Sequence, residues 1–240
     1  MTNEDKLVEV VLISPFKLRH RVFASELQKN SININCVMIE NHKKSLSRLL
    51  NGFCSISKVL DLYLSVVEFI MIGKQNIHDT EKIYIRTTND IQIVDAVNRI
   101  HPDAVIVYGG SIIPNEILQN ITVPFINIHG AVLPGYRGLD SHWWLELDSK
   151  KHLQGYTIHF LESGIDTGNI ILSKRYSGFR NCVSRNTKWR LWIAKKSASD
   201  VANLLKNDLN TAPSIKHDLS KSTYRSRISL YNFILSRRKD

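Results

Sequence analysis

The sequence predicts an α/β fold in which a mostly parallel, twisted sheet is flanked by helices. Short apolar runs rich in β-branched residues alternate with segments of helical periodicity, the pattern of parallel strands joined by right-handed crossovers. The 240 residues can bury a full core, and the composition, 43% hydrophobic and 22% charged, is typical of a soluble globular domain. We expect one catalytic domain over residues 1–210 and a short basic C-terminal extension over residues 211–240.

The first half of the chain alternates regularly between the two kinds of segment. The run VEVVLIS at 8–14 indicates a buried strand, and Ser14-Pro15 ends it. Asn89-Asp90 offers an N-cap for a helix whose expected apolar face is Ile91, Val94, Val97 and Ile100. The expected strands are 8–14, 34–39, 82–86 and 103–107, and the expected helices are 18–29, 43–72, 91–100 and 114–119.

The second half contains the loops in which we expect the functional residues. A strand over 125–129 runs directly into a Gly- and Pro-containing loop over 130–138. Further strands are expected over 155–161 and 169–176, followed by a helix over about 182–209. Ligands of parallel sheets bind at the carboxyl ends of the strands. The segments expected at that edge are Gly109-Gly110, 127–138 and 165–168.

The positive charge of the chain is concentrated near its C-terminus. The net charge is +10, but residues 174–240 hold 16 basic and 4 acidic residues, which gives +12, and the remainder carries −2. Such a field favours a polyanionic partner, for example a phosphorylated substrate, nucleic acid or an anionic membrane surface. A solvated basic tail that only aids solubility is an equally good interpretation.

Cysteine usage and hydropathy indicate a cytoplasmic protein without a membrane span. The odd count of three cysteines, without a CxxC pair, argues against a disulfide framework and structural zinc. The polar Met1–Lys6 segment does not resemble a signal peptide, and the charges within the apolar stretch 53–73 favour a buried amphipathic helix. No metal site is expected, because the spacings of His78, His101, His142 and His152 do not suit ligands.

An amide, an imidazole and a carboxylate form the constellation that carries chemistry. Asn127 and His129 lie two residues apart on a predicted strand, so their side chains share one face. Asp166 follows in an Asp-Thr-Gly turn, 37 positions after His129. Transfer of an acyl group to an amine requires stabilisation of an oxyanion and management of the amine's proton, and these three groups suit those tasks.

Asn127-Ile-His129, the loop Leu133-Pro-Gly-Tyr-Arg137-Gly138 and the Asp166-Thr-Gly168 turn occur in the order found in a known family. The sequence resembles the 10-formyltetrahydrofolate-dependent formyltransferases, and most sharply so over residues 103–171. The resemblance implies a Rossmann-like formyltransferase fold and N10-formyltetrahydrofolate as co-substrate. It also implies that Asn127 hydrogen-bonds the formyl oxygen, that His129 lies near the transferring carbon, and that Asp166 holds His129 and orders a water.

The same resemblance implies a pterin pocket. The run Tyr108–Pro114 matches the family's pocket-lining stretch, and His159 matches a histidine of some members, which makes it a supporting candidate. Many members have a serine at the position of Ala131, and the polar and aromatic segment 139–144 is unusual in a loop that borders the acceptor. The residues expected to bind the co-substrate are Gly110, Ser111, Ile112, Ile113, Glu162 and Ser163.

The acceptor amine is less well indicated. From its length we expect the sequence to lack the further C-terminal domain of methionyl-tRNA formyltransferases. It shows no Gly-rich first loop like that of glycinamide ribonucleotide transformylases, and it looks most like the nucleotide-sugar N-formyltransferases. The acceptor contacts would then be Lys17, Arg19, Arg137 and Tyr224. Another amine, such as an amino acid or peptide, remains compatible, as does hydrolysis of formyltetrahydrofolate. Nucleic-acid binding through the basic tail is the non-enzymatic alternative, a homodimer is compatible with the sequence, and no membrane insertion is expected.

Overall fold

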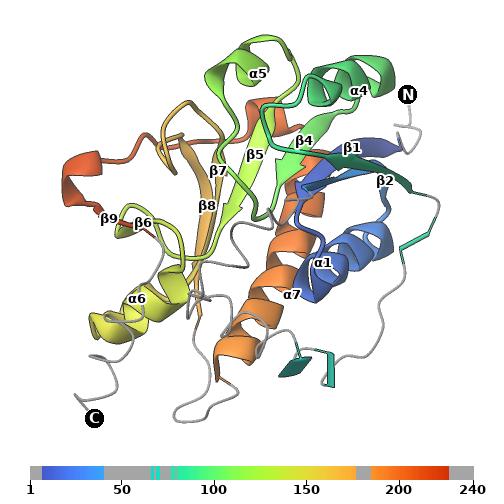
Figure 1. The fold of residues 1–240 in the computed structure, drawn as a ribbon. Helices are drawn as coiled ribbons and strands as arrows, with labels where there is room; N and C mark the ends of the chain where they lie inside the picture. Colours follow the sequence, from blue (N-terminus) through green and yellow to red (C-terminus); the bar gives the residue numbers. More distant parts are fainter. Residues whose placement is uncertain are drawn as a thin grey trace, which may run out of the picture.

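A seven-stranded sheet runs through the molecule in the order β3-β2-β1-β4-β5-β7-β8 (Figure 1). The computed structural model describes residues 7–40, 66–67, 69–70, 77–78, 80–176 and 185–226. The strands are β1 (Val8–Ser14), β2 (Ile32–Glu40), β3 (Glu81–Ile85), β4 (Ala104–Val107), β5 (Phe125–His129), β7 (Gly155–Phe160) and β8 (Ile170–Arg175). The helices are α1 (Leu18–Lys29), α4 (Gln92–Ile100), α5 (Asn115–Gln119), α6 (Ser141–Leu147) and α7 (Arg185–Lys206).

The strands from β3 to β5 pair in parallel, and the last two pairings, β5 with β7 and β7 with β8, are antiparallel. The predicted mostly parallel α/β fold is therefore confirmed. A second, two-stranded parallel sheet joins β6 (Tyr136–Gly138) to β9 (Thr223–Arg225). The sequence did not predict either of these three-residue strands.

Two apolar cores cover the two faces of the sheet. Along β1, Val10 and Leu12 pack into one core and Val11 and Ile13 into the other, because successive side chains of a strand point to opposite faces. The first core takes in α1 and α7, which lie against one face of the sheet, and the second takes in α4 and α5 (Figure 1). This layering leaves the loops at the carboxyl ends of β1, β4 and β5 free to form a site.

The helix predicted over 91–100 differs in detail from α4. Ile91 was expected on the apolar face of α4 but is 62% exposed, because the buried face consists of Ile93, Val94, Ala96 and Val97. Asp90 accepts a hydrogen bond from the amide of Gln92 at 3.2 Å, but α4 starts one residue later than expected, so that Ile91 and not Asp90 holds the N-cap position. The segment 139–144 becomes helix α6 from Ser141, and Trp144 is packed in the first core.

Several predictions concern residues outside the described part of the chain. These are most of the helix predicted over 43–72, the apolar stretch 53–73, Cys54, Cys182 and residues 227–240. Among the residues that the structure describes, no helix is long and apolar enough to cross a membrane. Within the same residues, no group of three or more His, Cys, Asp or Glu side chains is arranged to hold a metal ion.

Candidate active site

Three polar side chains from two segments meet at the carboxyl end of β5. Asn127 and His129 lie on β5, and Asp166 lies in the turn between β7 and β8. Asn127 Nδ2 donates to Asp166 Oδ1 at 3.2 Å, and His129 Nδ1 lies 3.3 Å from Asp166 Oδ2. His129 and Asp166 are 5% and 9% exposed, so the cluster is largely shielded from water. The residues that the sequence singled out are thus in mutual contact.

The local chain conformation explains this meeting. Residues 127 and 129 are on the same face of β5, while Ile126 and Ile128 on the other face are buried. Asp166 adopts a positive φ of 51°, a conformation that Asp tolerates better than bulkier residues. Gly168 passes so close to the carbonyl of Phe160 that any larger side chain would collide with it. The turn is therefore tight and aims the carboxylate back at β5.

His159, which we expected from the sequence only as a supporting residue, is the fourth member of the cluster. It lies on β7 directly opposite Asn127, and its ring is 2% exposed. Its Nδ1 lies 2.7 Å from the carbonyl oxygen of Phe160, which assigns the proton to Nδ1 and leaves Nε2 to accept from Asn127 Nδ2 at 3.1 Å. Nε2 also lies 3.5 Å from Asp166 Oδ1. Both hydrogens of the Asn127 amide nitrogen are therefore held by protein groups.

Two backbone groups of β6 complete the cluster. The carbonyl oxygen of Tyr136 lies 2.8 Å from His129 Nε2, and the amide of Gly138 donates to Asp166 Oδ2 at 2.8 Å. Both neighbours of the His129 ring, this carbonyl and the Asp166 carboxylate, are acceptors. A neutral imidazole can donate to only one of them at a time, so the ring can carry its proton on either nitrogen. Sequence patterns carry no signal for these backbone contacts.

Burial and charge have opposite effects within the cluster. Burial lowers the pKa of His129, an effect opposed by the negative charge of Asp166. Burial alone would raise the pKa of Asp166, but His129, the nearby His159 and the amide of Gly138 together hold it well below its ordinary range. The arrangement combines an ionised carboxylate with a neutral imidazole at pH 7. Such a pair can accept a proton and stabilise the resulting imidazolium.

The residues predicted to bind a co-substrate lie in two exposed loops. Gly110 and Ser111 are exposed after β4, and Ile112 is 57% exposed, whereas the Ile113 side chain is 1% exposed and packs in the second core. The amide of Ser111 donates to Glu40 Oε2 at 3.0 Å, which fixes the loop against the end of β2. Glu162 and Ser163 are exposed just before the Asp166 turn. Of the two isoleucines, only Ile112 offers its side chain to a ligand.

The predicted acceptor residues have mixed environments. Lys17 is exposed and Arg19 half-buried at the start of α1, on the loop that follows β1. The Arg137 guanidinium donates to Ser222 Oγ at 2.7 Å and to the carbonyl of Ile165 at 3.2 Å, so it joins protein segments. Tyr224 is 50% exposed, and its ring lies against the Cα side of Gly138.

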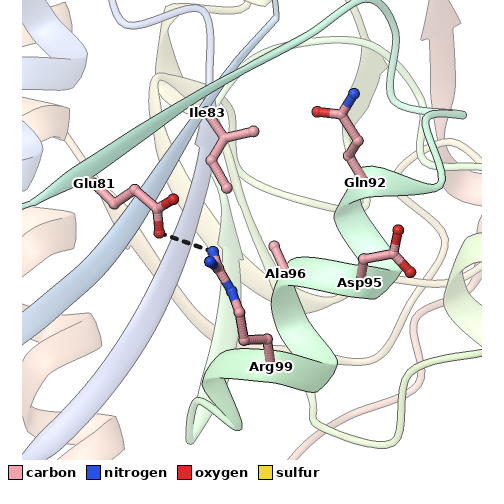
Figure 2. A pocket seen from close by; sticks show the side chains of 6 residues that line it. All are labelled: Glu81, Ile83, Gln92, Asp95, Ala96 and Arg99. Atoms are coloured by element: carbon pink, nitrogen blue, oxygen red, sulfur yellow. Dashed lines mark hydrogen bonds and ion pairs between the residues drawn. The ribbon is translucent and has the colours of Figure 1, made fainter.

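Two cavities lie outside this cluster. One, of about 370 Å³, is lined by β3 and α4 residues and contains the ion pair between Arg99 and Glu81 at 2.9 Å (Figure 2). The other, of about 520 Å³, is lined by Pro134, Ile170 and residues of the C-terminal segment. Neither is lined by Asn127, His129 or Asp166, so the chemistry is not centred in them.

Comparisons with known proteins converge on one family. The family model described as formyl transferase matches residues 10–180. The methionyl-tRNA formyltransferase of Caldicellulosiruptor saccharolyticus is 30% identical over 142 residues, which are 58% of this chain and 44% of that protein. That of Clostridioides difficile is 33% identical over 84 residues, 35% of this chain and 27% of that protein. The chain therefore spans less than half the length of these relatives.

Solved structures share the fold over most of the chain. A sugar N-formyltransferase from Shewanella sp FDAARGOS_354 has a TM-score of 0.58 at 17% identity, covering 96% of this chain and 86% of that chain. The formyltransferase PseJ from Anoxybacillus kamchatkensis, in complex with UDP-4,6-dideoxy-4-formamido-L-AltNAc and tetrahydrofolate, has a TM-score of 0.53 at 21% identity, covering 91% and 85%. These likenesses concern the fold. Because the family model matches well over half of its residues, the chain belongs to the formyl transferase family.

Proposed function

We propose that this protein transfers a formyl group from 10-formyltetrahydrofolate to a primary amine. The observation that carries the proposal is the contact of Asn127 and His129 with Asp166 at 3.2 and 3.3 Å, beside strand ends where ligands of α/β sheets bind. Membership of the formyl transferase family supports the same reaction. Formyl transfer needs the amide, imidazole and carboxylate that meet here.

The exposed loops beside the cluster fit a folate. Gly109 and Gly110 have positive φ angles and are exposed, so their peptide groups are accessible to the donor and acceptor edge of a pterin. The exposed Ile112 side chain offers an apolar surface for the flat face of the ring. When bound, 10-formyltetrahydrofolate would supply the formyl group, attached to N10. Glu162 and Ser163 are the polar groups we expect at the opposite wall.

The chain's own residues divide the work of moving charge and protons. Asn127 would release one of the two hydrogen bonds of its amide group, to Asp166 or to His159, and the freed N–H would donate to the formyl oxygen, where negative charge develops. His129 would take a proton from the attacking amine and return one to N10 as the new C–N bond forms and the old one breaks. Asp166 would stabilise the imidazolium. The products are an N-formyl amine and tetrahydrofolate, so atoms and protons balance.

For the acceptor we propose the amino group of a nucleotide-linked amino sugar. Tyr224 gives an exposed aromatic surface next to Gly138, whose amide holds Asp166. Lys17 and Arg19 follow β1 at the same edge of the sheet and could meet the phosphates of a nucleotide. Sugar N-formyltransferases are among the proteins with the same fold. A second candidate, methionyl-tRNA, is favoured by the 30% identity to methionyl-tRNA formyltransferases.

A panel of amines tests the proposal. The purified protein is incubated with 10-formyltetrahydrofolate and one candidate amine at a time. The amines are dTDP-, UDP- and GDP-linked amino sugars, methionyl-tRNA and glycinamide ribonucleotide. The mass of each product is measured by mass spectrometry. We expect a 28 Da mass increase, the difference between a formyl group and the hydrogen it replaces, on a nucleotide-linked amino sugar. Formylation of methionyl-tRNA alone would establish the second candidate.

Release of formate without formylation of any amine would replace transfer by hydrolysis. The Ala variants of Asn127, His129 and Asp166 are the negative controls, and we expect each to abolish transfer while retaining the wild-type circular dichroism spectrum. Near-native turnover in all three would refute the proposed mechanism.

A further inference from the structure

The segment of residues 211–226, which we name the C-terminal strap, crosses both loops that build the active site. It includes β9 and lies beside β6 in Figure 1. Ile215 exchanges two backbone hydrogen bonds with Ile170, of 2.8 and 2.9 Å. His217 Nε2 lies 3.1 Å from the carbonyl oxygen of Thr167, the residue after Asp166. The strap is thus anchored on the turn that carries the catalytic carboxylate.

Further along, the strap pairs with β6. Tyr136 lies opposite Thr223, and Gly138 lies opposite Arg225. The pairing continues past both ends of β6, with hydrogen bonds from the amide of Thr223 to the carbonyl of Gly135 at 3.0 Å and from the amide of Leu139 to the carbonyl of Arg225 at 2.9 Å. Among the described strands, β6 pairs only with β9.

β6 in turn contacts both His129 and Asp166. The two backbone groups that contact them, the carbonyl of Tyr136 and the amide of Gly138, are at the two ends of this three-residue strand. Each contact is 2.8 Å long, so a small displacement of β6 would lengthen both at once. Orientation of a catalytic group by such supporting hydrogen bonds strongly affects turnover.

Side chains also fasten the strap to β6. Asp148 accepts hydrogen bonds from the hydroxyl of Tyr136 and from Arg225 Nη2, the latter at 2.7 Å. The Arg225 guanidinium also lies over the Trp144 ring, 4.9 Å from its centre, and Trp144 Nε1 donates to the carbonyl of Ser226 at 2.9 Å. Through Asp148 and Trp144, the strap residue Arg225 is therefore linked to Tyr136 of β6 and to helix α6.

A second bridge connects the two catalytic loops through the strap. One guanidinium group, that of Arg137 in β6, reaches both Ser222 Oγ at 2.7 Å and the carbonyl of Ile165, next to Asp166, at 3.2 Å. Arg137, which the sequence suggested as a substrate contact, thus has a structural task in the arrangement seen here.

We propose that the C-terminal strap is a working part of the active site and that Arg225 is a positioning residue, which keeps the Tyr136 carbonyl and the Gly138 amide against His129 and Asp166. The proposal deepens the formyl transfer proposed above and rests on it only for the kinetic readout. Arg225 does not touch the reacting atoms; it acts through Asp148, Tyr136 and β6.

Kinetics of the full chain test this role. We expect Arg225→Met to lower kcat about tenfold, with KM for 10-formyltetrahydrofolate within about twofold of wild type, since the catalytic geometry rather than the folate loops is disturbed. Arg225→Lys, which keeps the charge and one hydrogen bond to Asp148, should recover part of the loss. The matched control is Lys174→Met, because Lys174 is similarly exposed, 45% against 37%, and pairs with Asp200 at 2.6 Å away from β6. It should leave kcat unchanged within about twofold.

A spectroscopic readout separates this inference from the proposed function. In protein labelled with ¹⁵N-histidine, Arg225→Met should shift the ring-nitrogen resonances of His129, and Lys174→Met should not. This result needs no turnover, so it stands even if no formyl acceptor is found. Unchanged His129 resonances in Arg225→Met, or a kcat equal to wild type, would overturn the inference. Should that variant fail to fold, Trp144→Phe, which removes the hydrogen bond to Ser226 and puts a smaller ring under the Arg225 guanidinium, is subjected to the same two measurements.

Discussion

Asp166 and Asp148 are two carboxylates connected to the same short strand, but they are surrounded in opposite ways. Asp166 is 9% exposed and faces two imidazoles, an amide side chain and a backbone amide. Asp148 is 25% exposed and faces the Arg225 guanidinium and the Tyr136 hydroxyl. The pKa of Asp148 lies below its ordinary value: burial would raise it, but the hydrogen bonds from Tyr136 and Arg225 and the positive charge of Arg225 outweigh that effect.

The difference indicates which carboxylate can take part in proton chemistry. A guanidinium keeps its charge at every accessible pH, so the Asp148 pair is fixed and suits a structural link. An imidazole gains and loses a proton near neutrality, so the charge state beside Asp166 can change during a reaction. β6 connects the two sites through Tyr136 and Gly138. We therefore expect substitutions at the two carboxylates to have different effects on turnover and on stability.

The largest expected contrast is between Asp166→Asn and Asp148→Asn. Asp166→Asn should lower kcat about 10³-fold, because the neutral amide cannot stabilise an imidazolium at His129. Asp148→Asn still accepts hydrogen bonds from Tyr136 and Arg225, so kcat should fall by no more than about tenfold. Its main effect should be a loss of about 1 kcal/mol in the free energy of unfolding, measured in urea.

Equal losses of turnover in these two variants would remove the distinction between a catalytic and a structural carboxylate. Circular dichroism spectra of both proteins serve as the control for folding. A larger kcat loss in Asp148→Asn than in Asp166→Asn would mean that the position of β6 matters more than the charge of Asp166.

Two glycines of one loop test how closely the strap and β6 approach each other. Gly138 has φ +98°, and a Cβ there would lie 2.1 Å from the Arg225 carbonyl oxygen, whereas a Cβ on Gly130 meets nothing within 4 Å. Gly138→Ala should therefore lower the free energy of unfolding by about 3 kcal/mol, from backbone strain and the collision. Gly130→Ala should change it by less than about 0.5 kcal/mol. Chemical denaturation measures both, and similar values for the two variants would contradict the close approach.

The parts of the fold that are long and periodic could be predicted from the sequence. The bounds expected for 8–14, 18–29 and 125–129 agree with β1, α1 and β5, because each is a continuous apolar or amphipathic run bounded by turn residues. The pairing of β6 with β9 could not be predicted, since two strands of three residues, 85 positions apart in sequence, leave no periodic pattern. The face of α4 was predicted wrongly because Ile91 fits the helical spacing but lies before the first full turn.

The sequence predicted those members of the candidate site that act through their side chains, and it did not predict the backbone contacts. Asn127, His129 and Asp166 were identified because their residue types and order form a motif, and the structure brings them into contact. His159 had weaker support, because its place depends on the antiparallel pairing of β7 with β5, and a motif does not encode register. The roles of Tyr136 and Gly138 are backbone contacts, so their side-chain types do not reveal those roles. The roles assigned to the folate and acceptor residues stay predictions.

The smallest expected effect is on how the free energy of unfolding depends on pH, and it is specific to the buried histidines. Burial lowers the pKa of His129, and burial with the nearby charges of Arg19 and Lys17 lowers that of the buried His20 well below its usual value. Below a pH of about 6.5 the unfolded chain therefore binds protons that the folded chain does not, so stability falls as pH falls. Each such group adds up to about 1.4 kcal/mol per pH unit to the slope of the unfolding free energy between pH 6.5 and its lowered pKa.

Urea denaturation at several values between pH 7 and pH 5 separates the contributions. His20→Phe keeps an aromatic ring against Tyr108, whose ring centre lies 5.0 Å away, and should make the slope shallower whatever it does to stability at pH 7. Asp148→Asn should keep the wild-type slope, because the pKa of Asp148 is already lowered and its carboxylate stays ionised throughout this range. Its curve should lie parallel to, and below, that of the wild type. A changed slope in Asp148→Asn would mean that the Arg225 pair is coupled to the histidines of the cluster, so that the two carboxylates form one titrating network.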